Sequence, residues 1–314
     1  MKRSTKVGLA IAGVTAAASA AALKLSSRTN DVPVEEPDRA EPFIEPGIDG
    51  DAFLANLGEA IRIDTTSYDD RSQIDYSAFE EFRAFLERTY PLVHETCERE
   101  IVGEHSLLYT WKGTDESLDP LVLMAHIDVV PVEEGTESDW SHPPFSGERS
   151  DGHVWGRGAL DDKGPLIGTI QAVEHLIREG FGPKRTVLIT FGHDEEISGH
   201  EGASVVADVA RARGVTPFMV LDEGGGVADG VPGITSEPVA LVKVAEKGYM
   251  DVKLTALGEG GHSSMPPSST AIGLLAEAVR RLEITPMPAR LSAVEPTFKA
   301  VAPRMDPKVR GVLT

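Results

Sequence analysis

Residues 155–164 read Trp-Gly-Arg-Gly-Ala-Leu-Asp-Asp-Lys-Gly, with apolar segments on both sides. Glycines allow the backbone to adopt positive φ angles and to approach a ligand closely. The adjacent carboxylates of Asp161 and Asp162 repel each other and are costly to desolvate, so a turn that holds both needs a compensating charge. A divalent cation is the simplest such charge. The stretch therefore predicts a metal site, and our hypothesis is that Asp161 lies between two metal ions there.

Apolar segments with alternating strand and helix patterns surround this turn. The expected strands are residues 107–111, 121–125, 187–191 and 218–221. The first expected helix begins near Asp51, which is a plausible N-cap, and further helices are expected at 79–86, 165–179 and 202–212. The buried face of the second helix is expected to consist of Phe79, Phe82, Phe85 and Leu86. Short, almost continuously apolar strands between amphipathic helices indicate a sheet that is covered on both faces. The expected fold class is therefore α/β, with a mixed, mostly parallel sheet and helices on both faces.

Three of the expected strands end in acidic or imidazole side chains. These residues are His126 and Asp128, Glu195 and Glu196, and Asp222. In open α/β sheets, ligands bind beyond the carboxyl ends of the strands. We therefore expect these side chains and the Asp161 turn to meet at one edge of the sheet.

The chemistry of each side chain suggests a role at such an edge. His126 is a good imidazole ligand, and Asp128 can hold the other ring nitrogen in place. Of Glu195 and Glu196, one can bind a metal while the other acts as a general base. Each feature also has a simpler explanation: a strand-end pair that shapes a turn, a solvated acidic pair and, for Asp222, a loop or helix-cap aspartate. The acidic pair directly follows an apolar strand, which favours the functional explanation.

Composition narrows the classes of function. The chain is 41% hydrophobic and 25% charged, as in an ordinary globular protein with one or two domains. Its net charge of −20 argues against a nucleic-acid partner, which would require a basic face. Cys97 is the only cysteine, so a transition metal would be bound by imidazole and carboxylate. That set of ligands suits a catalytic site better than a structural zinc site.

The chain is expected to begin with a targeting segment. Lys2, Arg3 and Lys6 precede an uncharged, alanine-rich run at residues 7–23, which is typical of a secretory signal peptide or a membrane anchor. A soluble alanine-rich helix is the alternative. Either targeting segment would make the protein extracytoplasmic, whether secreted or anchored to the membrane by its N-terminus. The expected organisation is a leader at 1–25, a Pro-rich acidic tether at 26–50, a catalytic domain at 51–244 and an incomplete α+β lid domain at 245–314.

The expected lid domain combines strands and a helix. Its strands are predicted at 240–245 and 249–256, and its helix at 270–282. The Gly-rich segment 258–264 between them contains His262. A lone loop histidine is more often a surface residue, but a ring flanked by glycines and serines also suits a ligand contact.

Five motifs occur in the order and spacing of one known family. They are residues 126–128, 156–164, 194–196, 221–225 and 261–264, and residues 140–147 add a resemblance to its carboxypeptidase S branch. Over residues 50–314 the chain resembles the zinc-dependent exopeptidases and aminoacylases typified by glutamate carboxypeptidase, succinyl-diaminopimelate desuccinylase and yeast carboxypeptidase S. The resemblance implies a metal-dependent hydrolase that cleaves peptide or N-acyl-amino-acid amide bonds with a water activated by two zinc ions.

The resemblance also assigns the zinc ligands. It implies one zinc held by His126, Asp161 and Asp222, and a second zinc held by Asp161 and Glu196. The family pattern requires one more histidine near the end of the chain as a ligand of the second zinc, and none of the nine histidines follows His262. We therefore expect this chain to bind one zinc well and the second poorly, and to have little activity by itself.

The remaining roles follow from the same resemblance. Glu195 would be the general base, and Asp128 would orient the imidazole ligand. The peptide bond between Asp161 and Asp162 would be cis, and His262 of the lid domain would polarise the scissile carbonyl. The substrate would be a small peptide or an N-acyl amino acid, and the lid domain would mediate a homodimer.

Two alternatives stay open at this stage. The sequence does not distinguish a carboxypeptidase from an aminoacylase. The alternative function is a catalytically inactive extracytoplasmic binding or interaction protein that retains the fold, although the presence of the base and the ligands argues against it. A nucleotide-binding function is disfavoured, because no G-x-G-x-x-G opens a helix after a strand and no Walker lysine pattern occurs.

Overall fold

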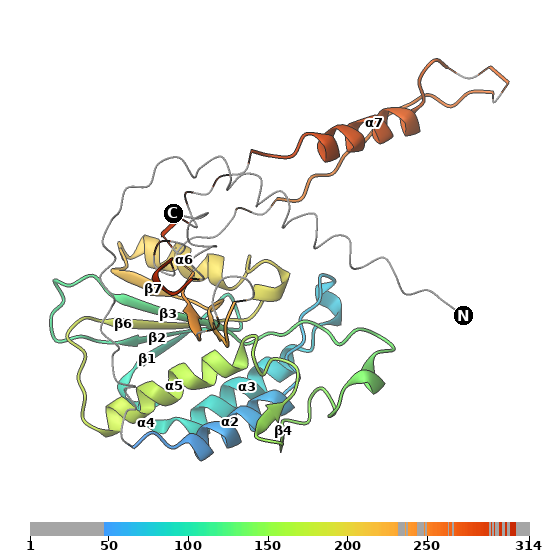
Figure 1. The fold of residues 1–314 in the computed structure, drawn as a ribbon. Helices are drawn as coiled ribbons and strands as arrows, with labels where there is room; N and C mark the ends of the chain where they lie inside the picture. Colours follow the sequence, from blue (N-terminus) through green and yellow to red (C-terminus); the bar gives the residue numbers. More distant parts are fainter. Residues whose placement is uncertain are drawn as a thin grey trace. The chain divides into compact units, whose positions relative to one another are not determined.

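The computed structural model (Figure 1) describes residues 47–231 continuously and, beyond them, residues 236, 238–243, 248, 250–262, 264–265, 267–288, 290, 292, 295–296, 299 and 302–305. The chain divides into the unit Glu41–Glu223 and a second unit that combines Met1–Ala40 with Gly224–Thr314. This division lies earlier in the chain than the boundary expected after residue 244. The leader expected at residues 1–25 and most of the tether expected at 26–50 lie outside the described residues.

The unit Glu41–Glu223 is built on a five-stranded sheet. Its strands are β1 (Glu98–Val102), β2 (Ser106–Trp111), β3 (Leu121–His126), β6 (Val187–Gly192) and β7 (Met219–Leu221), in the spatial order β1-β2-β6-β3-β7. Strand β2 is antiparallel to β1 and β6, whereas β3 is parallel to β6 and β7. The predicted mixed, mostly parallel sheet is therefore confirmed.

Helices cover both faces of this sheet, as predicted (Figure 1). One face packs against α2 (Gly50–Arg62), α3 (Tyr76–Thr89), α4 (Pro91–Thr96) and α5 (Lys163–Arg178), and the other packs against α6 (Ala203–Ala212). The side chains of a strand point alternately to its two faces, so β2 contributes to both cores. Leu107 and Tyr109 lie in the larger core, and Leu108 packs with Val206 of α6 in the smaller one.

The sequence pattern of α3 explains how the larger core is filled. Phe79, Phe82, Phe85 and Leu86 recur at helical spacing, and all four are buried, as predicted. The N-terminal cap expected for the preceding helix at Asp51 is wrong. Asp49 caps α2 instead, because its Oδ1 accepts a hydrogen bond from the Ala52 N–H at 2.9 Å.

The register of the parallel strands brings their carboxyl ends to the same edge of the sheet. His126 at the end of β3 pairs with Gly192 at the end of β6, and Leu123 of β3 pairs with Leu221 at the end of β7. The segments that follow these three strands therefore leave the sheet side by side. This edge is where ligands bind in open α/β sheets.

Short elements connect the larger ones. They are η1 (Arg71–Gln73), η2 (Glu137–Asp139), η3 (Glu195–Ile197) and the antiparallel hairpin of β4 (Glu148–Ser150) and β5 (His153–Trp155). Strand β5 leads directly into the glycine-rich turn. Gly156 of that turn has a φ of 155°, and a Cβ atom there would lie 2.3 Å from Cγ2 of Ile61. Glycine is therefore required where the turn crosses α2.

The second unit contains fewer regular elements among its described residues. They are β8 (Gly226–Ala228), which pairs antiparallel with β9 (Val239–Leu241), then α7 (Ala271–Ile284) and η4 (Ala302–Arg304). Helix α7 matches the predicted helix, and β9 covers part of the strand predicted at 240–245. Residues 250–256 form no strand, contrary to prediction. Alternating polarity is insufficient without a neighbouring strand, and none pairs with them in the described part of the chain.

Among the described residues, no helix combines the length and the apolar character needed to cross a bilayer. The alanine-rich run at residues 7–23 lies outside them, so its role as a signal peptide or anchor stays a prediction.

Candidate metal centre

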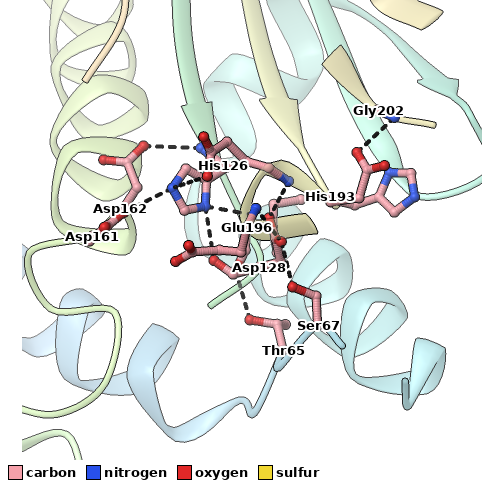
Figure 2. Close-up of polar contacts among 12 residues, drawn as sticks. Thr65, Ser67, His126, Asp128, Asp161, Asp162, His193, Glu196 and Gly202 are labelled. Atoms are coloured by element: carbon pink, nitrogen blue, oxygen red, sulfur yellow. Dashed lines mark hydrogen bonds and ion pairs between the residues drawn. The ribbon is translucent and has the colours of Figure 1, made fainter. Parts of the chain in front are cut away.

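His126 forms the centre of a group of carboxylates at the carboxyl edge of the sheet (Figure 2). Its ring is buried at the end of β3. The Nε2 atom lies 3.0 Å from Oδ1 of Asp161, 3.7 Å from Oε2 of Glu223 and 3.8 Å from Oε2 of Glu195. Three acidic side chains from different segments thus converge on one imidazole nitrogen.

The other ring nitrogen of His126 is held by Asp128. Nδ1 lies 2.9 Å from the Asp128 carbonyl oxygen and 3.4 Å from its carboxylate Oδ1, so it donates its hydrogen toward that residue. Burial lowers the pKa of His126, but the hydrogen bond and charge of Asp128 and the charges of Asp162 and Glu195 raise it to about 10. Without a metal, Nε2 therefore carries a proton. A cation at Nε2 would take the place of that proton.

Asp128 also fixes the backbone of the acidic pair. Its fully buried carboxylate accepts hydrogen bonds from the N–H of Glu195 at 3.0 Å and of Glu196 at 3.1 Å. The Ser67 hydroxyl donates a further hydrogen bond at 2.7 Å. Ser67 lies in the segment after α2. In the same segment, the Thr65 hydroxyl donates a hydrogen bond at 2.7 Å to the carbonyl of Ile127, the residue that follows β3. Sequence reasoning missed Ser67 and Thr65, because neither belongs to a recognisable motif.

The glycine-rich turn presents its two aspartates differently. The peptide bond between Asp161 and Asp162 is cis, as the family resemblance implied. The Asp161 side chain is exposed and reaches His126, whereas Asp162 is buried and accepts the backbone N–H of His126 at 3.0 Å through Oδ2. Oδ1 of Asp162 is buried and has no hydrogen-bond partner among the described residues. A buried carboxylate oxygen without a partner is costly unless a proton or a cation compensates it.

The acidic pair Glu195 and Glu196 lies in η3, directly after β6. Glu196 belongs to the group of ligand atoms formed with His126 and Asp161, and Glu195 lies beside it. Burial is the main cause that raises the pKa of both side chains, to about 7 for Glu196, and the neighbouring carboxylates add to it. The carboxylate of Asp194, in contrast, accepts the N–H of Glu201 and of Gly202, each at 2.8 Å, so it shapes the loop before α6.

Two sets of ligand atoms lie within 4.8 Å of one another among the described residues. One set is His126, Asp161 and Glu196, and the other is His126, Asp162 and Glu223. Sequence reasoning missed Glu223, although the acidic pair at the end of β7 signals that either carboxylate could face the site.

Asp222 and His262 are among the predicted site residues that lie outside these sets. Asp222 is exposed, although its charge contributes to the raised pKa of Glu195. His262 lies in the other unit and is exposed, and its Nδ1 accepts the Ser264 N–H at 3.2 Å. The assignment of Asp222 to a zinc and of His262 to the scissile carbonyl both stay predictions.

The arrangement fits a divalent cation bound by nitrogen and oxygen. Burial and the surrounding negative charges raise the pKa of Asp162 and Glu223 to about 7, as they do for Glu196. A cation would compensate these crowded carboxylates and the unpartnered Oδ1 of Asp162. An imidazole combined with carboxylates and no thiolate is a common zinc environment in catalytic sites.

Zinc affinity is expected to fall as the pH is lowered from about 8 to about 6. Carboxylates with a raised pKa are partly protonated in this range, and His126 carries a proton on Nε2, so zinc must displace protons from the site. Calorimetry in buffers of different ionisation enthalpy should therefore detect about one proton or more released per zinc at pH 7. The Glu196→Gln variant should release fewer protons. An affinity and a proton count that do not change with pH would contradict this assignment of ligands.

Comparison with known proteins identifies a family for this chain. Residues 122–302, more than half of the chain, match the sequence model of peptidase family M20/M25/M40. The N-fatty-acyl-amino acid synthase/hydrolase PM20D1.1 of Danio rerio is 43% identical over 79% of this chain and 48% of its own length. Carboxypeptidase S of Saccharomyces cerevisiae is 41% identical over 74% of this chain and 42% of its own length.

Human carnosine dipeptidase 1 is one of the solved structures that the comparison with this chain finds. It matches with a TM-score of 0.45 and 21% identity, covering 59% of this chain and 40% of that protein. The chain thus spans about half the length of the relatives that it matches.

Proposed function

Because the chain belongs to the peptidase family M20/M25/M40, we propose that it is the metal-binding part of a hydrolase that cleaves amide bonds. The observation that carries this proposal is the convergence of carboxylates from Asp161, Glu195 and Glu223 on Nε2 of His126. Such a cluster is costly to assemble without a cation and has no evident use in stabilising the fold.

Zinc is the cation that we propose, since the ligands are imidazole and carboxylate. Asp161 is proposed to face two zinc positions, one with His126 and Asp222 and the other with Glu196. Glu223 is a further candidate ligand beside Asp222, because its carboxylate lies 3.7 Å from the imidazole. Both sets of ligand atoms share His126, and because its Nδ1 donates to Asp128, the ring offers one nitrogen to a metal. We therefore expect a single zinc to be held tightly.

The bound cation supplies Lewis acidity that polarises an amide carbonyl and lowers the pKa of a water molecule. In the proposed reaction, Glu195 accepts the proton of the attacking water as the new C–O bond forms. Glu195 then returns this proton to the amide nitrogen as the C–N bond breaks, which yields a carboxylic acid and an amine. Burial raises the pKa of Glu195, which makes its carboxylate a stronger base than an exposed glutamate. His262 is the group that we assign to the charge on the carbonyl oxygen.

The substrate class is proposed from the names of the relatives. One relative is named for N-fatty-acyl amino acids and another is named a carboxypeptidase. Both names describe an amide bond next to an amino acid with a free carboxylate. We propose a small peptide or N-acyl amino acid as the substrate, and an extracytoplasmic location that rests on the basic and alanine-rich start of the sequence.

A substrate panel tests this function. Dipeptides and N-acyl amino acids are incubated with an excess of the zinc-loaded chain, which makes slow hydrolysis measurable, and the released amine is quantified. Hydrolysis is expected for compounds with a free carboxylate and is expected to disappear after treatment with a chelator. No hydrolysis of any compound by a zinc-loaded chain would contradict the proposed activity and would favour a binding protein that retains the fold.

A further inference from the structure

Lys163 is the one cation of the glycine-rich turn whose side chain is fully buried. It is the first residue of α5, and its amino group donates hydrogen bonds to the carbonyl oxygens of Ala60 at 3.0 Å and Ile63 at 2.6 Å. A buried amino group is costly unless it finds such partners. The proposed reaction does not use this side chain, so its burial needs another explanation.

The partners of Lys163 lie at the C-terminal end of α2. This helix ends at Arg62, and its last carbonyl groups lack partners within the helix and carry the negative end of its dipole. Phe82 adds its ring face at 5.4 Å from Nζ. Burial lowers the pKa of Lys163, and the charge of Asp64, like that of the nearby Asp128, opposes this shift. The free carbonyl groups at the end of α2 can thus accept hydrogen bonds from a lysine that lies far away in the sequence.

The glycine-rich turn is shaped around the stem of Lys163. The Lys163 N–H donates to the Gly158 carbonyl at 2.9 Å, which closes the turn around Asp161 and Asp162. Gly158 has a φ of 81°, and a Cβ atom there would lie 2.6 Å from Cγ1 of Val129 and 3.3 Å from Cδ of Lys163. A side chain at Gly158 would therefore collide with Val129 and press against the stem of Lys163.

The Asp161 side chain lies largely exposed at the end of this turn. Its exposed fraction is 66%, so its position depends on the backbone of the turn rather than on packing. That backbone is fixed on one side by the hydrogen bond of Asp162 to the His126 N–H and on the other by Lys163.

We propose that Lys163 is a positioning residue of the metal centre. The hydrogen bonds of its amino group connect the turn to the end of α2, which keeps the Asp161 carboxylate beside Nε2 of His126. This inference rests on the proposed function, because it presupposes that Asp161 binds a metal. It explains why a lysine directly follows the two aspartates.

Zinc binding by the Lys163→Met variant tests this role. Methionine keeps most of the volume but cannot donate to the Ala60 and Ile63 carbonyls. Zinc affinity, measured by competition with a chromophoric chelator at a temperature where circular dichroism shows a folded protein, is expected to fall about 10- to 100-fold. The visible spectrum of bound cobalt(II) is expected to change. The matched control Lys184→Met, at an exposed lysine, is expected to leave both unchanged.

A purely structural role would lower the melting temperature of Lys163→Met but leave the zinc affinity and the cobalt spectrum of folded molecules as in the wild type. That result would overturn the inference while leaving the proposed function intact. A wild-type chain that binds no zinc would instead refute the proposed function, and the inference with it.

A second measurement uses the wild-type chain and remains decisive if Lys163→Met does not fold. Lysines are acetylated in a short pulse with and without zinc and are then quantified by mass spectrometry. Because coupling between two sites is reciprocal, zinc is expected to slow the acetylation of Lys163 at least about tenfold while that of Lys184 stays constant. Equal acetylation of Lys163 in both conditions would contradict the inference.

Discussion

Replacing Glu195 by Gln is expected to lower the turnover of an amide substrate about 10²- to 10⁴-fold, the range that a general acid–base side chain contributes, while zinc stays bound. Glutamine has the same size and keeps the backbone hydrogen bond to Asp128, but it cannot accept a proton from water. Oε2 of Glu195 lies 3.8 Å from Nε2 of His126, within reach of the site but outside both sets of ligand atoms.

Two measurements on the same preparation distinguish a base from a ligand. Hydrolysis is followed with protein in excess over substrate, and zinc is quantified by atomic emission. The control Glu179→Gln changes an exposed glutamate after the C-terminal end of α5 and is expected to affect neither value. Retained turnover in Glu195→Gln would refute the assigned base, and lost zinc would show that Glu195 is a ligand.

Replacing His126 by Ala is expected to weaken zinc binding by more than the roughly 10- to 100-fold that loss of a positioning contact costs. Both sets of ligand atoms contain His126, so neither keeps three protein ligands without it. The remaining carboxylates are hard oxygen ligands, which favour magnesium or calcium over zinc. Competition with a chromophoric chelator measures the loss, and His153→Ala, at an exposed ring, is the control. Unchanged zinc affinity in His126→Ala would place the metal elsewhere.

Local patterns in the sequence predicted much of the fold and the main residues of the centre. The helical spacing of Phe79, Phe82 and Phe85 indicated their burial because periodicity depends only on neighbours along the chain. The convergence of His126 and Glu196 was predictable because the carboxyl ends of parallel strands meet at one edge.

Other features depend on contacts that no local pattern records. Ser67 and Lys163 act on partners that lie 61 and 100 residues away in the sequence. Whether Asp222 or Glu223 faces His126 depends on the backbone conformation after β7. Two neighbouring carboxylates cannot be distinguished in this respect from the sequence. Asp49 caps α2 in place of Asp51 because the helix begins one residue after Asp49, a boundary that periodicity does not define.

The zinc content of the wild-type chain tests the central claim most directly. The chain is loaded with zinc, dialysed against a weak chelator and analysed by atomic emission. We predict about one zinc per chain, because both sets of ligand atoms among the described residues depend on the same histidine, His126. No retained zinc would contradict the metal centre itself. Two tightly held zinc ions would contradict the expectation that the second position is weak in this chain.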